Sequence, residues 1–316
     1  MILINIFLII VFIFILIQFV AVYISYRLFF PKKVSTEFTI QDEIEKGEIT
    51  DDFLKINKEN FILKSDMNYD LSGFCIKGKS NNTVIFCHGI AWTKYGCIKY
   101  MYSFIKKGWN IIAYDHRGCG ESGGEGPSYG YYEKYDLEKV IQFANDKFPK
   151  TKFLGLYGES MGASTILQYS KAKENLNFII AVCPFSSLIQ LIQFHLKSAK
   201  IPNFIHNILL YSINKYSKVL QRFSIYDVNP LDDSLTNHIP IFLAHGNLDK
   251  ITPYSMSEEI YNRRKNMAIT SLFLGENSGH TPEIYMQHRN EFETRLWKFI
   301  SSLQKNKIKK SSKNKE

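Results

Sequence analysis

One short segment, residues 153–163, constrains the fold of this chain more than any other. It reads Phe-Leu-Gly-Leu-Tyr-Gly-Glu-Ser-Met-Gly-Ala, and its apolar run stops at Gly158 before a helical pattern begins beyond Ser160. The segment therefore predicts a buried strand, a tight turn and a helix in immediate succession. Such a turn is strained and presents the Ser160 hydroxyl at the top of a sheet. Glycines suit positions 158 and 162, because a side chain there would collide with the neighbouring strand or helix.

A second serine fits the same Gly-x-Ser-x-Gly pattern and provides a comparison. Ser122 follows a strand-like run, but residues 125–130 then read Glu-Gly-Pro-Ser-Tyr-Gly, which is typical of a loop. The helix expected after Ser160 would instead direct its N-terminal N–H groups and its dipole toward an oxyanion. We therefore predict that Ser160 is a nucleophile and that Ser122 is a loop residue. The alternative for Ser160 is a chance match in a tight turn.

A serine nucleophile needs a base, and the base needs an acid that orients it. After a turn of this kind the partners follow in the order Ser, Asp or Glu, His. The strand-like run 239–244 leads to Asp249, and the apolar run 268–274 leads to His280 just before the last helix. We predict that Asp249 is the acid and His280 the base. Taken singly, Asp249 could be a turn residue and His280 an exposed loop residue.

The remaining acids and histidines fit this order less well. Asp232 and Asp233 precede the strand-like run and are the reserve acids. His245 ends that run but precedes a glycine turn, which favours a structural role. His288 lies inside the final amphipathic helix, where we expect it on the solvated face. Three further histidines have no strand end nearby: His195, His206 and His238.

An oxyanion hole needs two backbone N–H donors. One should be the N–H of Met161, the residue after the nucleophile. The other should come from an early loop between a strand and a helix, and the buried-strand run 83–87 is followed by His-Gly-Ile. We predict the N–H of Ile90 as this second donor. His88 precedes the serine in the chain, so we expect it to have a structural hydrogen-bonding role.

These motifs together resemble the α/β-hydrolase superfamily and, within it, the membrane-anchored serine hydrolases of the serine aminopeptidase-like or Bem46-like group. The matching pieces run from His88 through the segment 115–123 and the serine turn to Asp249 and His280. The resemblance implies that the loop around Ser122 is structural. The chain lacks the His-Gly-Gly-Gly run of hormone-sensitive lipases and the His-Gly-Gly-Pro-Gly run of proline iminopeptidases. A serine in the turn, rather than an aspartate, also disfavours epoxide hydrolases and haloalkane dehalogenases.

The length and the order of patterns suit one α/β domain over residues 31–303 of the 316. Strand-like runs alternate with helical patterns from residue 83 onward, which predicts a mostly parallel sheet with helices on both faces. The alternation breaks over 186–233, where apolar residues recur at helical spacing. The resemblance implies that this insertion is a small helical cap over the active site. Its apolar side chains could contact a hydrophobic acyl group or merely pack the cap onto the domain.

The N-terminus reads as a membrane anchor over residues 1–30. Residues 1–26 carry no charged side chain and, as a helix, exceed a hydrocarbon core of about 30 Å. A cleaved signal peptide, the alternative, would show a basic start, a shorter apolar run and a small-residue cleavage site. Arg27, Lys32 and Lys33 follow the span, so the positive-inside rule predicts a cytoplasmic catalytic domain.

The formal net charge of +9 is concentrated in part in a Lys-rich tail, residues 304–316, which we expect to be disordered. This tail could attract anionic lipid headgroups or merely aid solubility. The chain shows no nucleic-acid-binding motif, so no nucleic-acid partner is expected.

The sequence therefore predicts a membrane-anchored serine hydrolase that cleaves carboxylic esters or thioesters, with a lipid or acyl substrate. The catalytic set would be Ser160, Asp249 and His280, and this chemistry requires no metal or cofactor. Two alternatives stay open: a peptidase or amidase of the same fold, and a non-catalytic scaffold that binds a ligand or partner at the membrane.

Overall fold

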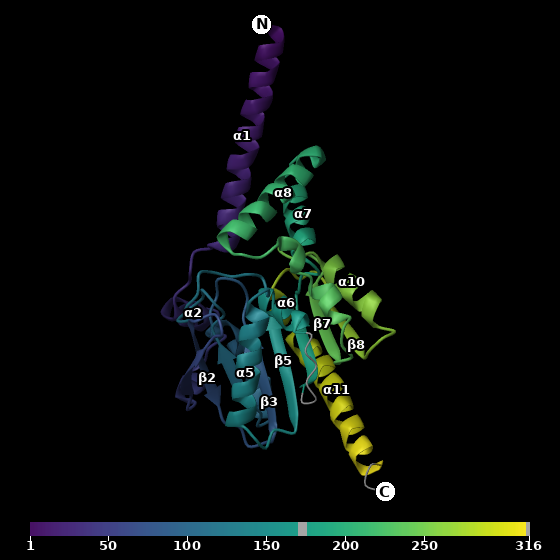
Figure 1. Ribbon diagram of the computed structural model, residues 1–316. Coiled ribbons are helices and arrows are strands. Elements are labelled where there is room, and N and C mark those ends of the chain that lie inside the picture. Colours follow the sequence, from purple (N-terminus) through teal and green to yellow (C-terminus); the bar gives the residue numbers. More distant parts are fainter. Residues whose placement is uncertain (170–175, 314–316) are drawn as a thin grey trace.

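The computed structural model describes residues 1–169 and 176–313, and in this part of the chain eight strands form one central sheet (Figure 1). In chain order the strands are β1 (Glu59–Lys64), β2 (Asp70–Ile76), β3 (Asn82–Cys87), β4 (Asn110–Tyr114), β5 (Phe153–Glu159), β6 (Leu176–Val182), β7 (Ile241–Gly246) and β8 (Thr270–Gly275). Their spatial order is β1-β2-β4-β3-β5-β6-β7-β8. Strands β3 to β8 pair in parallel, which confirms the predicted mostly parallel sheet. The antiparallel pairs β1–β2 and β2–β4 were not predicted.

Helices cover both faces of the sheet. They are α2 (Thr36–Glu45), α3 (Asp51–Lys55), α4 (Ile98–Lys106), α5 (Glu133–Lys147), α6 (Met161–Gln168), α9 (Pro230–Ser234), α10 (Tyr254–Arg264) and α11 (Glu283–Lys313). Strand β3 shows how the layers form, because alternate side chains point to opposite faces. Val84 and Phe86 join a cluster with α4 and α11, whereas Ile85 and Cys87 join one with α5, α6 and α10. The sheet is thus held between two apolar layers.

The inserted segment 186–233 is helical, as its spacing predicted. It forms α7 (Leu188–Ser198), α8 (Asn203–Leu220), a 3₁₀ turn at Ile225–Asp227 and α9. Helices α7 and α8 make a hairpin that projects away from the sheet in the same direction as the N-terminal helix (Figure 1). Leu231 of α9 packs instead into the cluster that covers the sheet. The part that stands over the sheet edge is therefore the α7–α8 hairpin.

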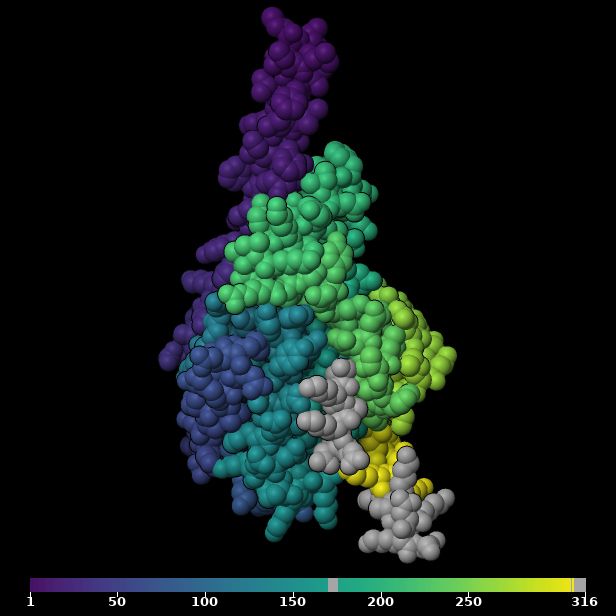
Figure 2. Space-filling view, viewed as in Figure 1, coloured from purple at the N-terminus to yellow at the C-terminus, as the bar shows by residue number. Residues whose placement is uncertain are grey.

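Helix α1 (Ile2–Phe29) is the one helix among the described residues that is long and apolar enough to cross a membrane, and a signal sequence would have the same features. Its first half projects free of the domain (Figures 1 and 2). Its second half packs against α8, where the Tyr216 hydroxyl lies 3.3 Å from Gln18 Oε1. The helix joins an apolar cluster, here called the cap core, whose buried members are Ala21, Phe29, Tyr129, Phe185, Leu188, Leu191, Ile192, Leu196, Leu209, Leu210, Ile213, Phe223, Ile225, Val228 and Met256. The last turns of α1, before the expected boundary at residue 30, thus pack on the domain.

The C-terminal helix extends into the segment 304–316, for which the sequence predicted disorder. Helix α11 continues to Lys313, and residues 314–316 lie outside the described part of the chain. Phe299, Ile300 and Leu303 hold the helix against the sheet. Once a helix has formed, each further residue adds a hydrogen bond without the cost of a new nucleus. The helix has a kink at His288, which is half-buried and contacts the Glu276 carbonyl at 2.8 Å.

Candidate active site

Ser160 occupies the strained turn between β5 and α6. Its backbone lies at φ 52° and ψ −120°, a conformation that costs a non-glycine residue about 1–3 kcal/mol. The two glycines around it are sterically required. A Cβ atom on Gly162 would lie 2.2 Å from the Cys87 carbonyl oxygen, and one on Gly158 would lie 2.5 Å from the Gly162 carbonyl carbon. The close packing of β3, β5 and α6 explains the spacing of the motif.

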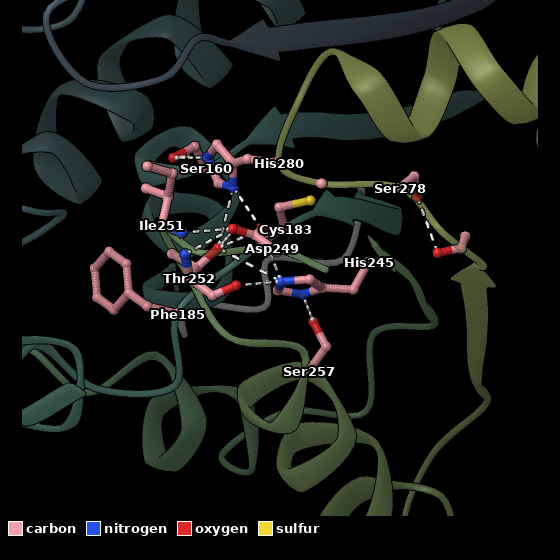
Figure 3. A network of polar contacts seen from close by, with 12 residues as sticks. Ser160, Cys183, Phe185, His245, Asp249, Ile251, Thr252, Ser257, Ser278 and His280 are labelled. Carbon is pink, nitrogen blue, oxygen red and sulfur yellow. Dashed lines mark hydrogen bonds and ion pairs between the residues drawn. The ribbon is translucent and has the colours of Figure 1, made fainter. Parts of the chain in front are cut away.

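The structure brings the three predicted site residues together (Figure 3). Ser160 Oγ lies 2.9 Å from His280 Nε2, and His280 Nδ1 lies 2.6 Å from Asp249 Oδ2. Ser160 follows β5, Asp249 follows β7 and His280 follows β8. Because these strands are parallel, their carboxyl ends share one edge of the sheet, where α/β proteins bind their ligands.

Asp249 is held as a buried carboxylate. Its Oδ1 accepts the backbone N–H groups of Ile251 at 2.8 Å and Thr252 at 2.9 Å. Its Oδ2 also lies 3.0 Å from the Thr252 hydroxyl. Burial raises the pKa of Asp249, but hydrogen bonds from His245 and His280 outweigh this and hold the pKa below its ordinary value. The group is thus ionised at neutral pH and can orient an imidazole.

A second histidine contacts the same carboxylate from the other side (Figure 3). His245 Nε2 lies 3.1 Å from Asp249 Oδ2 and 2.7 Å from the Thr252 carbonyl, so it acts as a donor. His245 Nδ1 lies 2.7 Å from the Ser257 hydroxyl, which can donate to it. The ring is fully buried. These contacts agree with the structural role that we expected for His245 from the glycine turn after it. The supporting Thr252 and Ser257 were missed, since hydroxyl residues near strand ends carry no distinctive pattern.

The other candidates have structural surroundings. His88 Nε2 accepts the backbone N–H of His116 at 2.9 Å, and burial lowers the pKa of His88. The Ser122 hydroxyl is buried and donates to the Asp115 carbonyl at 2.7 Å. It is Ser160, and not Ser122, that contacts His280. The reserve acids lie on α9, where Asp232 pairs with Arg263 and Asp233 with Lys134.

The predicted oxyanion donors lie beside the serine. Met161 is the first residue of α6, where a backbone N–H has no partner within the helix. Ile90 follows β3, and a Cβ atom on the preceding Gly89 would lie 3.5 Å from Ser160 Cβ. Ile90, Ser160 and Met161 line one cavity. The three residues therefore border the same space.

Two cavities meet at Ser160. The first, here called the apolar cavity, has a volume of about 470 Å³ and is lined by Val20, Tyr23, Ile24, Leu28, Ile90, Tyr129, Ser160, Met161, Phe185, Leu191, Ile192, His195, Leu196, Ala199, Ile201, Ile251 and Thr252. The second, here called the polar cavity, has a volume of about 310 Å³ and is lined by Glu43, Lys46, Gly89, Ile90, Trp92, Lys99, Glu159, Ser160, Ile251, His280, Thr281 and Pro282. Ser160 thus lies between two chemically different cavities.

Buried charges shape the polar cavity. Lys99 Nζ lies 3.2 Å from Glu159 Oε2, and both side chains are almost fully buried. Burial lowers the pKa of Lys99, but the carboxylates of Glu159 and Glu43 raise it above its usual value. The Trp92 indole donates to Glu43 Oε1 at 3.3 Å, and burial raises the pKa of Glu43. This group of side chains was not predicted, because its members lie on α2, α4, the end of β5 and the loop after β3, which only the fold brings together.

Cys183 lies behind the triad, and its thiol, the Asp249 carboxylate and His280 lie within 4.8 Å of one another, a spacing that a metal ion could bridge. The donor set fits a metal poorly. Burial raises the pKa of Cys183 well above its usual value, which favours the thiol over the thiolate that binds metals. His280 Nδ1 and Asp249 Oδ2 are also already joined at 2.6 Å.

Comparison with known proteins places the chain in a family. Residues 82–204 match the family described as alpha/beta hydrolase fold. The uncharacterised protein YqkD of Bacillus subtilis is 30% identical over 289 residues, which cover 90% of this chain and 93% of YqkD. The chain belongs to the α/β-hydrolase superfamily.

Solved structures of other α/β hydrolases share the fold. The Pyrococcus furiosus esterase Pf2001 superposes with a TM-score of 0.64 at 24% identity, covering 86% of this chain and 98% of the esterase. The Pyrococcus horikoshii acylaminoacyl peptidase gives a TM-score of 0.60 at 17% identity, covering 79% of this chain and 42% of the peptidase. At these identities the similarity shows the fold alone, and the same fold occurs in an esterase and in a peptidase.

Proposed function

We propose that this α/β hydrolase is a serine hydrolase that cleaves carboxylic esters or thioesters through an acyl-enzyme. One observation carries the proposal: His280 lies 2.9 Å from the Ser160 hydroxyl and 2.6 Å from the buried Asp249 carboxylate. A strained serine with a histidine and a carboxylate in this order has the parts that nucleophilic acyl transfer needs.

The reaction begins when Ser160 Oγ attacks the substrate carbonyl carbon and His280 Nε2 takes the hydroxyl proton. Asp249 holds the His280 Nδ1–H and stabilises the imidazolium. The N–H groups of Ile90 and Met161 donate to the oxyanion of the tetrahedral intermediate. Collapse expels the alcohol or thiol, which receives the proton from His280. Water, deprotonated by His280, then attacks the acyl-enzyme and releases the acid and free Ser160.

The two cavities suggest where the parts of the substrate bind. His280 lines the polar cavity, and the histidine must reach the leaving group to protonate it. The leaving alcohol or thiol would therefore lie in the polar cavity. The acyl group would lie in the apolar cavity, whose lining is mostly hydrophobic. This division supports an acyl or lipid ester as the substrate.

A substrate panel tests ester against amide hydrolysis. We expect the full-length protein in detergent to hydrolyse p-nitrophenyl acyl esters and to react with a fluorophosphonate probe. Amino-acid p-nitroanilides should be cleaved far more slowly, since the apolar cavity offers little to pair with a charged amino group. Faster cleavage of the amides would contradict the ester assignment and support the peptidase alternative.

We also propose that α1 is an uncleaved membrane span and that the catalytic domain faces the cytoplasm. The packing of Ala21 and Phe29 in the cap core supports retention of the helix, and Arg27, Lys32 and Lys33 support the orientation. The protein should therefore stay in the membrane pellet after alkaline carbonate extraction, with an intact mass that includes α1. Recovery of a mature chain that begins beyond residue 29 would show a cleaved signal sequence instead.

A further inference from the structure

Helix α1 presents two neighbouring stripes to the domain. Ala21, Ser25 and Phe29 recur every four residues and are fully buried. Val20, Ile24 and Leu28 recur at the same interval and line the apolar cavity. Because residues four apart lie on one face of a helix, the first stripe fixes α1 against the cap and the second faces the cavity.

The contacts of α1 hold this arrangement in place. The Tyr129 hydroxyl donates to the Leu28 carbonyl at 3.2 Å, and the rings of Phe29 and Phe223 pack edge to face with centroids 5.6 Å apart. Leu191, Ile192 and Leu196 of α7 line the same cavity as α1, and Ser160 and Met161 line it as well. A ligand in the cavity would therefore contact α1, α7 and the nucleophile.

The outer surface of the cap is apolar where it accompanies α1. Phe204, Ile208 and Tyr211 lie on one face of α8 and are 79%, 39% and 71% exposed. The hairpin that carries them projects alongside α1 (Figures 1 and 2). A helix that exposes such side chains beside an apolar span is suited to lie at the surface of a bilayer. The surroundings of the cavity are thus continuous with a lipid-facing surface.

We infer that α1 is a wall of the acyl-binding site and that the substrate is an ester or thioester of a membrane lipid. Its acyl chain binds against Val20, Ile24 and Leu28 with its carbonyl at Ser160. This inference rests on the proposed hydrolase function of Ser160. It adds that the membrane-spanning helix itself selects the acyl chain, and that the bilayer supplies the substrate.

A matched pair of substitutions tests the wall. Val20 and Val22 are similarly exposed, at 36% and 44%, but Val20 lines the apolar cavity and Val22 is not among the residues lining it. In full-length protein, Val20→Trp should fill the cavity and lower the ratio of kcat/KM for p-nitrophenyl decanoate to that for p-nitrophenyl acetate by about tenfold or more. Val22→Trp should leave this ratio unchanged. An unchanged ratio in Val20→Trp, or an equal fall in Val22→Trp, would overturn the inference.

Ile24→Ala keeps the inference testable if Val20→Trp does not fold. This variant enlarges the cavity, so the acyl length that is hydrolysed fastest should shift to longer chains. If acetate hydrolysis and fluorophosphonate labelling persist, an unchanged dependence of the rate on acyl length would overturn the inference. Absence of Ser160-dependent hydrolysis in the folded wild type would instead overturn the proposed function itself.

The lipid source needs a separate measurement. Full-length protein in nanodiscs should hydrolyse a fluorogenic acyl ester lipid placed in the same bilayer, and Val20→Trp should slow this reaction by about tenfold or more. Hydrolysis of soluble acyl esters without hydrolysis of the bilayer lipid would overturn the assignment of a membrane lipid as the substrate.

Discussion

Ser160→Ala should abolish fluorophosphonate labelling and lower kcat for ester hydrolysis by about 10³-fold or more. The alanine removes the oxygen that attacks the carbonyl, and His280 and Asp249 then have no nucleophile to activate. Residual hydrolysis would come from binding and from the oxyanion donors alone. The measurement is in-gel labelling and ester hydrolysis by the full-length protein in detergent, with circular dichroism to verify the fold.

Ser122→Ala is the matched control, because Ser122 sits in the other Gly-x-Ser-x-Gly sequence of the chain. Its hydroxyl joins the Asp115 carbonyl to the Ser72 N–H in a buried loop, so the substitution should reduce stability and spare labelling. Labelling that survives in Ser160→Ala, or that is lost only in folded Ser122→Ala, would refute the assignment of the nucleophile.

Asp249→Asn should lower kcat for ester hydrolysis by about 10³–10⁴-fold. The carboxylate accepts from His280 Nδ1 at 2.6 Å and so leaves Nε2 free to accept the Ser160 proton. An amide placed there can donate to Nδ1, which favours the tautomer with the proton on Nε2, the wrong one for a base. It also removes the negative charge that stabilises the imidazolium. Steady-state hydrolysis of p-nitrophenyl acetate measures the loss.

Asp232→Asn supplies the matched control for this substitution. Asp232 is the reserve acid of the sequence, but its side chain is 60% exposed on α9, where Arg263 lies 3.6 Å away. Exposed ion pairs of this kind contribute at most about 1 kcal/mol, so kcat should stay close to that of the wild type. Equal losses in both variants, or activity in Asp249→Asn within about tenfold of the wild type, would contradict the role of Asp249.

The gathering of Ser160, Asp249 and His280 could be predicted because each follows an apolar run that reads as a buried strand. Parallel strands bring their carboxyl ends to one edge, so order along the chain implies proximity in space. No comparable rule predicts the lining of the polar cavity. Glu43, Trp92 and Lys99 lie on separate elements, and no spacing along the chain indicates that they meet.

The role of α1 was hidden for a different reason. Residues 1–26 are apolar or uncharged on every face, so no contrast between faces shows which side packs on protein and which would meet lipid. The two stripes through Ala21 and Val20 become visible only when α8 and the cavity are in place. The charge of the Lys-rich end suggested disorder and gave no sign of two contacts near it: Leu303 packs α11 against the sheet, and Lys307 donates to the Lys152 carbonyl at 2.7 Å.

The placement of α1 has a consequence for any shortened form of this protein. Cutting the chain just after residue 30, whether by a protease in the cell or to obtain soluble material for assays, would leave Ser160, Asp249 and His280 in the chain. It would also take away Val20, Ile24 and Leu28 and open the apolar cavity to water on that side. The freed enzyme would keep its chemistry while losing its selectivity for acyl length. A single cleavage would then both release the protein from the membrane and change the range of its substrates.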